Sequence, residues 1–554
     1  MTDALARGWT DLHERRWEAA QANFEAAAAR AQTAEALEGL SWAAWWRDDA
    51  EALFAARERA FALYKERGDM PGAARMAMWL AADELDFHGA LSVSSGWLAR
   101  ARRLLEAVEE RPEHGWLAFH EGYVARVRGD NAAAAEGAAI AARIGRRYGV
   151  ADLEMLGLAL EGSTLVACAE VEAGMRCLDE ATAAALEGEA AIPMANAWTF
   201  CFLVTACTAV LDYGRAAEWC ARIAEFAGRF GSRYMLAYCR AEYGAVDLFQ
   251  GRWAQAEELL ETAVEDFTRS RPGMVGGPLT ALAELRRRQG RTADATALLD
   301  RAGASRAAQL CRARIALDAR DARTGTELIE RALRQAGDDA LLDRAPALEL
   351  LVHARVAAGE PDAAGDALAA LRDVERRTGT SALRACADRA EGALAAAAGD
   401  HDRARRLLED AVDRFAGAGA TYELAHTRLE LAATLAELGR GDAAEREASV
   451  ALRTLDQLGA DGDAGRARRR LGATSDAEAA LPELTPRERE VLLVLAEGLT
   501  NHQIAERLVL SEHTVHRHVT NILRKLDLPS RSAAAARAVQ AGLLPGRDDE
   551  RVRR

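Results

Sequence analysis

Polar side chains follow two strips along residues 512–526, a segment that reads as a single helix. At about 100° per residue, the first strip carries five residues that can form hydrogen bonds: His513, His516, Arg517, Thr520 and Arg524. The second strip carries Thr514, His518, Asn521 and Lys525. The opposite face is apolar and consists of Val515, Val519, Ile522 and Leu526. We therefore expect this helix to pack by one face and to present donors and acceptors on the other.

Such a helix suits the major groove of double-stranded DNA, where base edges face the groove and phosphates line its rims. Arg517 is the strongest candidate for base contact, because a guanidinium can donate two hydrogen bonds to guanine O6 and N7. The expected base-contacting residues are His513, His516, Arg517 and Thr520. The expected phosphate-contacting residues, some at helix N-termini, are Thr500, Asn501, Ser511, Thr514, His518, Arg524 and Lys525. A charged, solvent-facing surface is the alternative for the same strips.

Neighbouring helices must position this one, and the sequence from residue 484 to 544 carries a cap at nearly every helix start. The expected starts and stops, in chain order, are the capping box of Thr485 and Glu488 with Pro486 at the first helical position, Gly498, Thr500 with Gln503, Ser511, Pro529 with Ser530, and Gly542. A fourth helix is expected over residues 532–541. Two helices joined by a tight turn, with the second polar on one side, predict a helix-turn-helix.

In order and spacing, this segment resembles the C-terminal DNA-binding domain of the LuxR family, also called the NarL or GerE type. The residues that carry the resemblance are Leu484, Thr485, Arg487, Glu488, Glu490, Val491, Leu492, Gly498, Asn501, Ile504, Ala505, Leu508, Ser511, Thr514, Val515, His518, Asn521, Ile522, Lys525, Leu526 and Arg531. The resemblance implies a bacterial transcription regulator that binds DNA as a homodimer, with RNA polymerase as a partner. It also implies a dimer contact on the fourth helix, through Ala533, Ala536 and Val539.

One departure from the family concerns His516, because the family commonly has lysine at this position. An altered base preference or weaker nonspecific binding is expected. The histidines of this segment leave a pH switch open beside ordinary groove contact.

The rest of the chain repeats one local pattern with a period near 40 residues. Each copy has a turn residue, often glycine, then a small residue five positions later, then an apolar helix, as in residues 251–260 (GRWAQAEELL). The twelve copies begin at Arg15, Arg47, Gly96, Gly129, Ala169, Asp212, Gly251, Gly290, Arg320, Gly359, Gly399 and Gly439. The small residue allows close approach of two paired helices, and stacked hairpins bury the stripe that a single hairpin leaves exposed. The unit resembles the tetratricopeptide repeat, and related helical solenoids share the pattern.

These patterns predict an all-α chain with four parts. They are a tetratricopeptide-like solenoid of helix hairpins (1–460), a linker (461–483), a four-helix LuxR-type helix-turn-helix domain (484–545) and a charged tail (546–554). The net charge of −15 argues against a protein that coats nucleic acid along its whole length. From residue 482 onward, 12 Lys and Arg stand against 10 Asp and Glu, so this end carries about +2 and the body about −17. An acidic body with a slightly basic end fits a DNA reader attached to a body that does not bind DNA.

No cofactor, metal or membrane contact is expected. The eight cysteines form no CxxC pair and read as reduced thiols of a cytoplasmic protein. The chain resembles the maltose-activator group of large LuxR-type regulators but has no GxxxxGK[ST] loop for ATP. The uncharged stretch 190–211 reads as a buried solenoid helix rather than a membrane span. Eight of the 11 tryptophans lie in the first 116 residues, where core packing is expected and an aromatic-lined ligand pocket is the alternative.

Two functions remain open. The first is a transcription regulator whose solenoid binds or senses a protein, peptide or small molecule and controls the C-terminal reader. The alternative is a DNA-tethered scaffold for protein–protein interaction that senses no signal itself. No nucleophile–base pair or metal-ligand cluster in the sequence indicates an enzyme.

Overall fold

The computed structural model describes residues 3–187, 193–230, 233–337, 339–479, 484–508, 510–526 and 528–540. Within these ranges the chain forms 29 α-helices and one short 3-10 helix, without a strand. The expected all-α fold is therefore confirmed. The chain divides into two compact units, residues 1–424 and 425–554.

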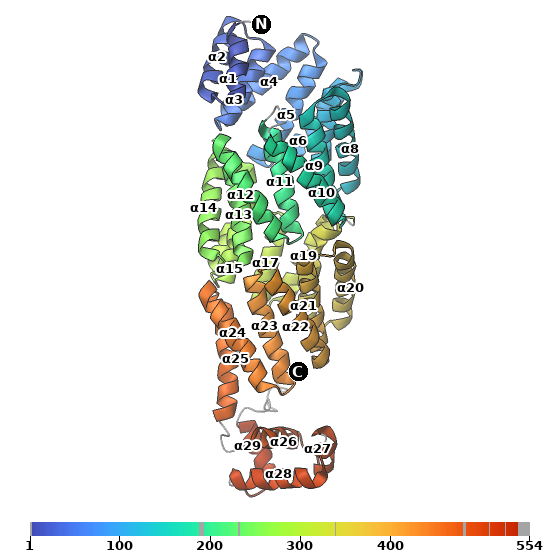
Figure 1. Cartoon of the computed structure of the whole chain (residues 1–554), viewed down its shortest axis with the longest axis vertical. Helices are drawn as coiled ribbons and strands as arrows, with labels where there is room; N and C mark the ends of the chain where they lie inside the picture. Colours follow the sequence, from blue (N-terminus) through green and yellow to red (C-terminus); the bar gives the residue numbers. More distant parts are fainter. Residues whose placement is uncertain are drawn as a thin grey trace. The chain divides into compact units, whose positions relative to one another are not determined.

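Successive helices pack in pairs as hairpins, which follow one another along the first unit (Figure 1). The hairpins are α1 (Asp3–His13) with α2 (Trp17–Arg30), α3 (Ala34–Trp46) with α4 (Ala50–Glu66), α5 (Met70–His88) with α6 (Leu91–Leu105), α7 (Pro112–Arg128) with α8 (Asn131–Tyr148), α9 (Ala151–Ala167) with α10 (Val171–Glu187), α11 (Pro193–Ala209) with α12 (Tyr213–Phe230), α13 (Arg233–Gln250) with α14 (Trp253–Ser270), α15 (Gly276–Arg288) with α16 (Thr292–Ala302), α17 (Arg306–Asp318) with α18 (Ala322–Gln335), α19 (Leu341–Ala357) with α20 (Pro361–Thr378), and α21 (Ser381–Ala397) with α22 (His401–Gly417). The helices α23 (Thr421–Glu437), α24 (Gly441–Leu458) and α25 (Asp461–Ala479) come next, so a helix occupies most of the span expected as a linker.

The turn inside each hairpin has the left-handed backbone that its sequence pattern requires. Nine of the twelve predicted turn residues have positive φ: Arg15, Gly129, Ala169, Gly251, Gly290, Arg320, Gly359, Gly399 and Gly439. At two further hairpins the left-handed residue is one position away from the predicted one, at Asp48 and Leu211. Left-handed backbone is strained for most side chains, which explains the frequent glycine.

The predicted turn at Gly96 is wrong. Gly96 lies inside α6, and the turn of this hairpin is at Gly89, with φ of +63°. The error spans seven residues, about two helical turns, so Ala101 lies on the same face of α6 as the true fifth residue, Ser94. Both residues are fully buried. The pattern therefore identified the correct face of α6 but placed the turn seven residues too late.

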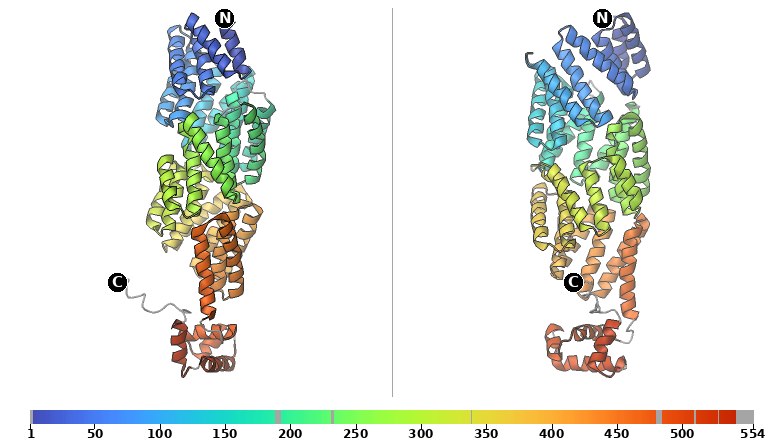
Figure 2. Two further views of the ribbon diagram at one scale, coloured as in Figure 1. Left: turned by 90° about the vertical axis from the view of Figure 1, so that its left-hand side faces the viewer. Right: turned by 180° about the vertical axis from the view of Figure 1, so that it is seen from behind.

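The hairpins of the first unit coil, so that residues far apart in sequence meet again (Figures 1 and 2). The Arg271 guanidinium donates to Asp48 over a distance of 2.8 Å, although the two residues are 223 positions apart in sequence. Arg126 donates to Asp343, 217 residues further along. Arg377 donates to the carbonyl of Cys168, 209 residues earlier. A coil of about five hairpins thus brings the chain back against itself.

Arg271 is the most buried of these links. Its side chain has an exposed fraction of 0% and also donates to the carbonyls of Trp45, at 3.0 Å, and Ser270, at 2.7 Å. The guanidinium carbon lies 4.3 to 5.3 Å from the ring centres of Trp45, Phe87 and Tyr234. Aromatic faces around a desolvated cation stabilise it further.

After residue 271 the chain forms the 3-10 helix η1 (Pro272–Met274), which leads into α15. Gly273 lies so close to the end of α5 that a Cβ atom there would come within 2.4 Å of the Leu85 carbonyl oxygen. Only glycine allows this approach between two hairpins distant in sequence.

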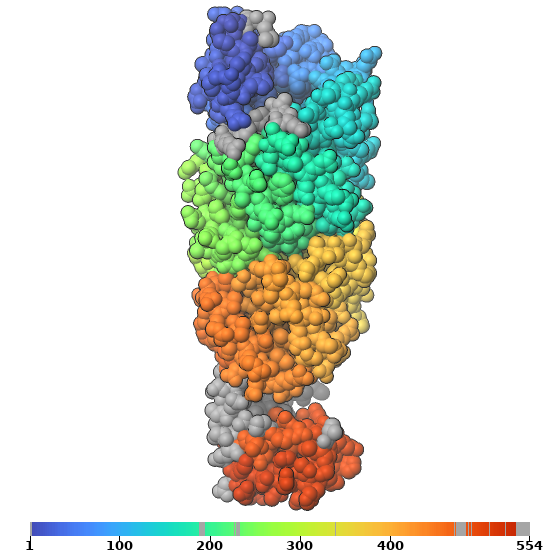
Figure 3. All heavy atoms as spheres, viewed as in Figure 1, coloured from blue at the N-terminus to red at the C-terminus, as the bar shows by residue number. Residues whose placement is uncertain are grey.

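Four of the eight tryptophans in the first 116 residues are buried in the hydrophobic core, as expected, and the other four are half-buried. Trp42, Trp45, Trp79 and Trp116 are buried, and Trp17 stacks on Trp46 with ring centres 4.6 Å apart. On the face seen in Figure 3, the side chains of neighbouring hairpins fill the space between their helices.

The structure also bears on the state of the cysteines and on the stretch considered as a membrane span. All eight cysteines are free thiols, and five of them are buried. None of the helices in the described part of the chain is long and apolar enough to cross a membrane, and α11 occupies the uncharged stretch considered above.

We predict that Arg271→Ala lowers the free energy of unfolding by about 3 kcal/mol, because it leaves the half-buried Asp48 carboxylate without its ion pair. Thermal and denaturant unfolding of the full chain measure this change. Arg269→Ala is the matched control, since this side chain is exposed and 3.8 Å from its partner Glu265. Equal effects of the two substitutions would contradict a structural role for Arg271.

Candidate nucleic-acid interface

The C-terminal helices form a small domain with its own hydrophobic core. They are α26 (Pro486–Ala496), α27 (Asn501–Leu508), α28 (Glu512–Lys525) and α29 (Arg531–Gln540), close to the predicted boundaries. Val515, Val519 and Ile522 of α28 pack in one cluster with Val491, Leu492, Leu495 and Ile504, and Leu508 joins its edge. The predicted apolar stripe is confirmed.

The predicted caps fix where these helices begin. Thr485 and Glu488 form the capping box of α26, with both reciprocal hydrogen bonds present. Thr500 and Gln503 do the same for α27, where the Thr500 amide donates to the Gln503 side chain over 2.9 Å. The Ser511 hydroxyl accepts from the Thr514 amide at 3.1 Å and caps α28. Gly498 has φ of +91° and ends the first helix, as expected.

The three faces of α28 differ in exposure as the helical wheel predicts. Its apolar stripe is buried apart from the half-buried Leu526, and its second polar strip (Thr514, His518, Asn521 and Lys525) is half-buried. The first polar strip is exposed along its whole length and consists of His513, His516, Arg517, Thr520 and Arg524. We name these five residues the donor face.

The candidate base-contacting residues all lie on the donor face. In the described part of the domain, no hydrogen bond or ion pair engages the side chains of His513, His516 or Arg517. The Thr520 hydroxyl donates to the His516 carbonyl at 2.9 Å, which leaves its oxygen free to accept. Three of the four side chains therefore have their full hydrogen-bonding capacity available to a ligand.

The candidate phosphate-contacting residues fall into two groups. Arg524 is exposed, and His518 is half-buried. The others already have intramolecular partners: Thr500, Ser511 and Thr514 in caps, Asn501 with Arg531 at 2.7 Å, and Lys525 with Glu488 at 2.7 Å. Backbone amides at the starts of α27 and α28 add further donors that suit an anion.

Glu488 connects two parts of this domain that are far apart in sequence. Its carboxylate accepts from the Thr485 amide of the cap and from the Lys525 ammonium at the end of α28, and its side chain is only 5% exposed. Burial raises the pKa of this carboxyl, but the hydrogen bonds from Lys525 and Thr485 outweigh it, so the pKa is lowered from its usual value of 4.5.

Two arginines for which the sequence predicted no role also connect helices. Arg487 donates to the Leu508 carbonyl at 2.8 Å, and Arg531 donates to the Asn501 side chain. In the sequence, these two arginines are distinguished only by belonging to the residues that carry the LuxR resemblance. These bonds orient α27, which precedes the turn into α28.

The fourth helix contributes small residues to both the core and the surface. Ala534 and Ala538 are buried, whereas Ala533 is half-buried and Ala536 is exposed. The side chain of Val539, the predicted stop at Gly542 and the tail 546–554 lie outside the described residues. The predicted dimer contact through Ala533, Ala536 and Val539 remains a prediction.

A helix pair with capped starts, a shared core and an exposed donor face defines the helix-turn-helix class of DNA-binding domain. Residues 482–538 match the family described as bacterial regulatory proteins, luxR family. The C-terminal domain is thus of the LuxR type, as its residues indicated.

Relatives share this region. Transcriptional regulatory protein LiaR of Bacillus subtilis (strain 168) is 51% identical over 63 residues, which cover 11% of this chain and 30% of that protein. Nitrate/nitrite response regulator protein NarL of Escherichia coli (strain K12) is 51% identical over 53 residues, 10% of this chain and 24% of that protein. The matched region spans less than a third of either relative.

A longer match is Rv0890c of Mycobacterium tuberculosis (strain ATCC 25618 / H37Rv), named as an HTH-type transcriptional regulator. It is 33% identical over 157 residues, which cover 27% of this chain and 17% of that protein. This match is longer than the stretch from residue 482 to 554, so it includes residues that precede the C-terminal domain.

Two solved structures are similar over most of the chain. Yeast Tom70 has a TM-score of 0.31 and 13% identity, covering 80% of this chain and 95% of that one. The APC/C hetero-tetramer Cut9-Hcn1 has a TM-score of 0.36 and 10% identity, covering 84% and 96%. Both scores are too low to support conclusions about this chain.

We predict that Glu488→Gln destabilises the C-terminal domain by about 1 kcal/mol at pH 7, because glutamine keeps the cap but leaves Lys525 without its ion pair. A lowered carboxyl pKa means that the ionised form stabilises the fold at pH values above the unfolded pKa of 4.5, and that this stabilisation is lost as the pH falls below it. The variant should lack that acid-dependent loss.

Thermal unfolding of residues 480–554 between pH 3 and 7 measures both effects. Glu506→Gln is the control, because this side chain is 70% exposed. If the wild type and the Glu488 variant lose stability equally below pH 4.5, the ion pair does not act as described.

Proposed function

We propose that this chain is a sequence-specific transcription regulator of the bacterial cytoplasm. Residues 484–545 read the major groove of double-stranded DNA as a homodimer and act on RNA polymerase. Residues 1–460 bind a protein, peptide or small-molecule signal, residues 461–483 link the two parts, and residues 546–554 form a charged tail. The proposal assigns no enzymatic activity and no cofactor to the chain.

The observation that carries this proposal is the exposed donor face of α28 within a LuxR-type domain. Arg517, at the middle of that face, has no intramolecular partner among the described residues, so its guanidinium is available for two hydrogen bonds to a guanine. His513, His516 and Thr520 flank it. Exposed, unpaired groups on a rigid helix meet the geometric need of base readout.

Phosphate contact is proposed for Arg524, His518, Thr514, the caps at Thr500 and Ser511, Asn501 and Lys525. Arg524 is the best placed of these side chains, since it is exposed and cationic. Lys525 contributes less charge than its type suggests, because Glu488 pairs with it. The matched domain is present in named response regulators and transcriptional regulators, which supports the proposal for the domain alone.

A scaffold function is the second candidate. The array of stacked hairpins offers a long surface of exposed, charged side chains, which suits protein partners. In that case the DNA-binding domain would only hold the array at a genomic locus, and no signal would change DNA binding.

We predict that residues 480–554 alone bind the same DNA sites as the full chain but escape its regulation. Mapping of bound sites across the genome, followed by transcription assays on the promoters found, measures both properties. Unchanged transcription and unchanged response to every candidate signal after removal of the solenoid would favour the scaffold over the sensor.

We predict that Arg517→Ala removes preference at one base pair and costs about 1–3 kcal/mol on the specific site, with little effect on nonspecific DNA. Arg524→Ala is the comparison, because loss of a phosphate contact should weaken binding to all sequences and reduce the salt slope by about 1. Competition binding with a set of point-substituted sites measures both. Uniform loss on all sequences by the Arg517 variant would reassign this residue to phosphate contact.

A further inference from the structure

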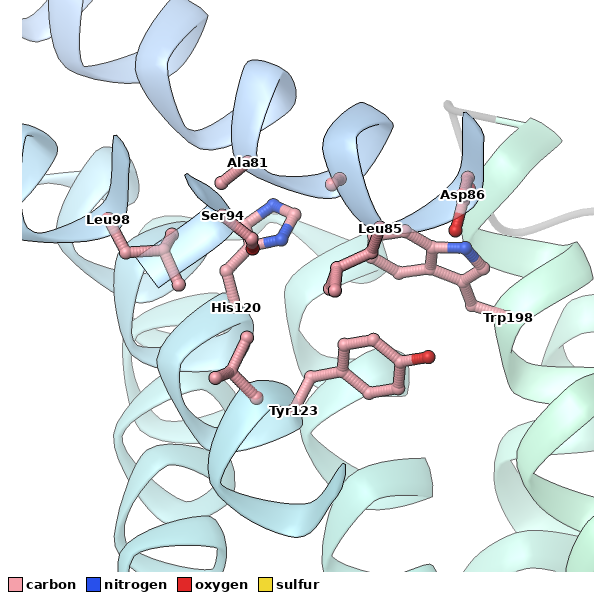
Figure 4. Close-up of a pocket in the computed structure, with 10 residues that line it drawn as sticks. Ala81, Leu85, Asp86, Ser94, Leu98, His120, Tyr123 and Trp198 are labelled. Carbon is pink, nitrogen blue, oxygen red and sulfur yellow. The ribbon is translucent and has the colours of Figure 1, made fainter. Parts of the chain in front are cut away.

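The histidines of this chain lie in two kinds of surroundings. In the helical repeats, His88 is paired with Glu84 at 2.8 Å. His120 is buried beside a small cavity of about 10 Å³, where its ring meets Trp198 edge-on at 5.5 Å (Figure 4). Burial lowers the pKa of His120 to about 3, so this imidazole carries no charge at neutral pH.

The donor face of α28 holds two histidines in the opposite situation. His513 and His516 are exposed, and in the described part of the domain no hydrogen bond or ion pair engages either ring. Residues three positions apart on a helix have Cβ atoms about 5–6 Å apart, so the two rings share one face. Histidine is the side chain whose charge ordinarily changes between about pH 5 and 8. The donor face can therefore gain positive charge as the pH falls.

Charges on α28 itself act on the His516 ring in both directions. Arg517 follows it on the donor face, and the positive end of the helix dipole lies one turn before it; both disfavour a cationic imidazole. Glu512, four residues earlier, favours one. This carboxylate is exposed and forms no ion pair with His516 in the structure as described. DNA brings negative charge to the same face, so the complex favours the protonated ring more than the free chain does.

The charged side chains of the helices packed against α28 have partners elsewhere. Among the described side chains, the pairs are Arg487 with Glu490, Glu488 with Lys525, Arg507 with Glu497, His502 with Glu506, and Arg531 with Asn501. The remaining charged side chain described on these helices is Arg537 of α29, which is half-buried. No described carboxylate lies within ion-pair distance of His513 or His516 before DNA arrives.

The two charge states of an imidazole recognise different base edges. A neutral ring offers one donor and one acceptor, whereas a protonated ring offers two donors. In the major groove, guanine presents the acceptors O6 and N7, while adenine and cytosine also present amino donors. A proton on the ring therefore favours guanine and adds a positive charge near the phosphates.

We propose that this domain takes up a proton from solvent when it binds DNA, and that His516 holds this proton while it donates to a guanine. His516 is better placed than His513, because it lies beside Arg517 at the middle of the donor face. His513 is the second residue of α28, where the positive end of the helix opposes a cationic ring most strongly. The inference rests on the proposed function and adds a regulation to it: DNA affinity rises as the pH falls.

Binding of the full chain to DNA at pH 6.0 and pH 8.0, at equal ionic strength, tests the proposal. The probe is a duplex of about 30 base pairs that the full chain selects from a random-sequence pool at pH 6.0, and a mixed-sequence duplex of the same length is the comparison. If the complex holds the proton about tenfold more tightly than the free chain, affinity for the selected duplex rises about 6-fold for each bound domain between pH 8.0 and 6.0. The rise on the mixed-sequence duplex should be smaller.

A second measurement counts the proton directly. Calorimetric titration of the selected duplex at pH 6.5, in two buffers with different heats of ionisation, should show net proton uptake on binding. His516→Gln keeps hydrogen-bonding groups without a titratable charge, so it should lose most of the uptake and most of the pH response. His516→Lys carries a fixed charge and should bind at pH 8.0 at least as tightly as the wild type does at pH 6.0.

The control variant is His88→Gln, which removes a histidine from the helical repeats and should respond as the wild type does. Burial raises the pKa of Asp86 and of Glu242 to about 7, so these two groups of the body also titrate in this range. Both are present in every variant, and their effect cancels in the comparison.

Equal affinity at the two pH values, or a pH response that His516→Gln retains, would overturn proton uptake at His516. An equal rise on the selected and mixed-sequence duplexes would overturn the guanine contact and assign the proton to a phosphate contact. Failure of the proposed function has a different signature, which is the absence of preference for the selected duplex at either pH.

Discussion

Close approach of two helix backbones is the contact on which each hairpin of the solenoid depends. At Gly174, five residues after the turn at Ala169, an added Cβ would come within 2.6 Å of the Gly162 carbonyl oxygen. Small residues at this position fix the angle between the paired helices, and a repeated angle makes the array coil. The coil then brings Arg271 to Asp48, and with it the charges and rings around α5. Ser94 keeps the position small but adds a hydroxyl, and a cavity lies beside it.

Much of this solenoid could be predicted from the sequence, because its pattern is local. A turn residue, a small residue five positions later and an apolar stripe lie within ten residues, so their period is visible directly. The failure at Gly96 has the same origin, since a shift of two helical turns preserves the face. Contacts between distant hairpins could not be predicted. Arg271 is one of 71 Lys and Arg, and nothing in its neighbours distinguishes it from an exposed arginine.

In the C-terminal domain, too, features within one helix could be predicted, whereas contacts between helices could not. Caps and stripes lie within one helix, so the four helices and the three faces of α28 were predicted closely. The bonds from Lys525 to Glu488 and from Arg531 to Asn501 join residues of different helices that are 37 and 30 positions apart in sequence. Helical periodicity does not indicate which charged groups meet across a core. The sequence therefore predicted Lys525 as a phosphate-contacting cation but did not predict its ion pair with Glu488.

That ion pair changes the electrostatics of DNA binding. With Lys525 paired to Glu488, α28 retains Arg517 and Arg524 as cations, beside its histidines. Each neutralised phosphate contributes to affinity by release of counterions, so two cations give one copy a small electrostatic contribution. Two linked copies double the contacts, and their effective concentration multiplies the affinity. In the homodimer proposed above, the pairing of two readers is therefore the step at which the proposed signal-binding body would act.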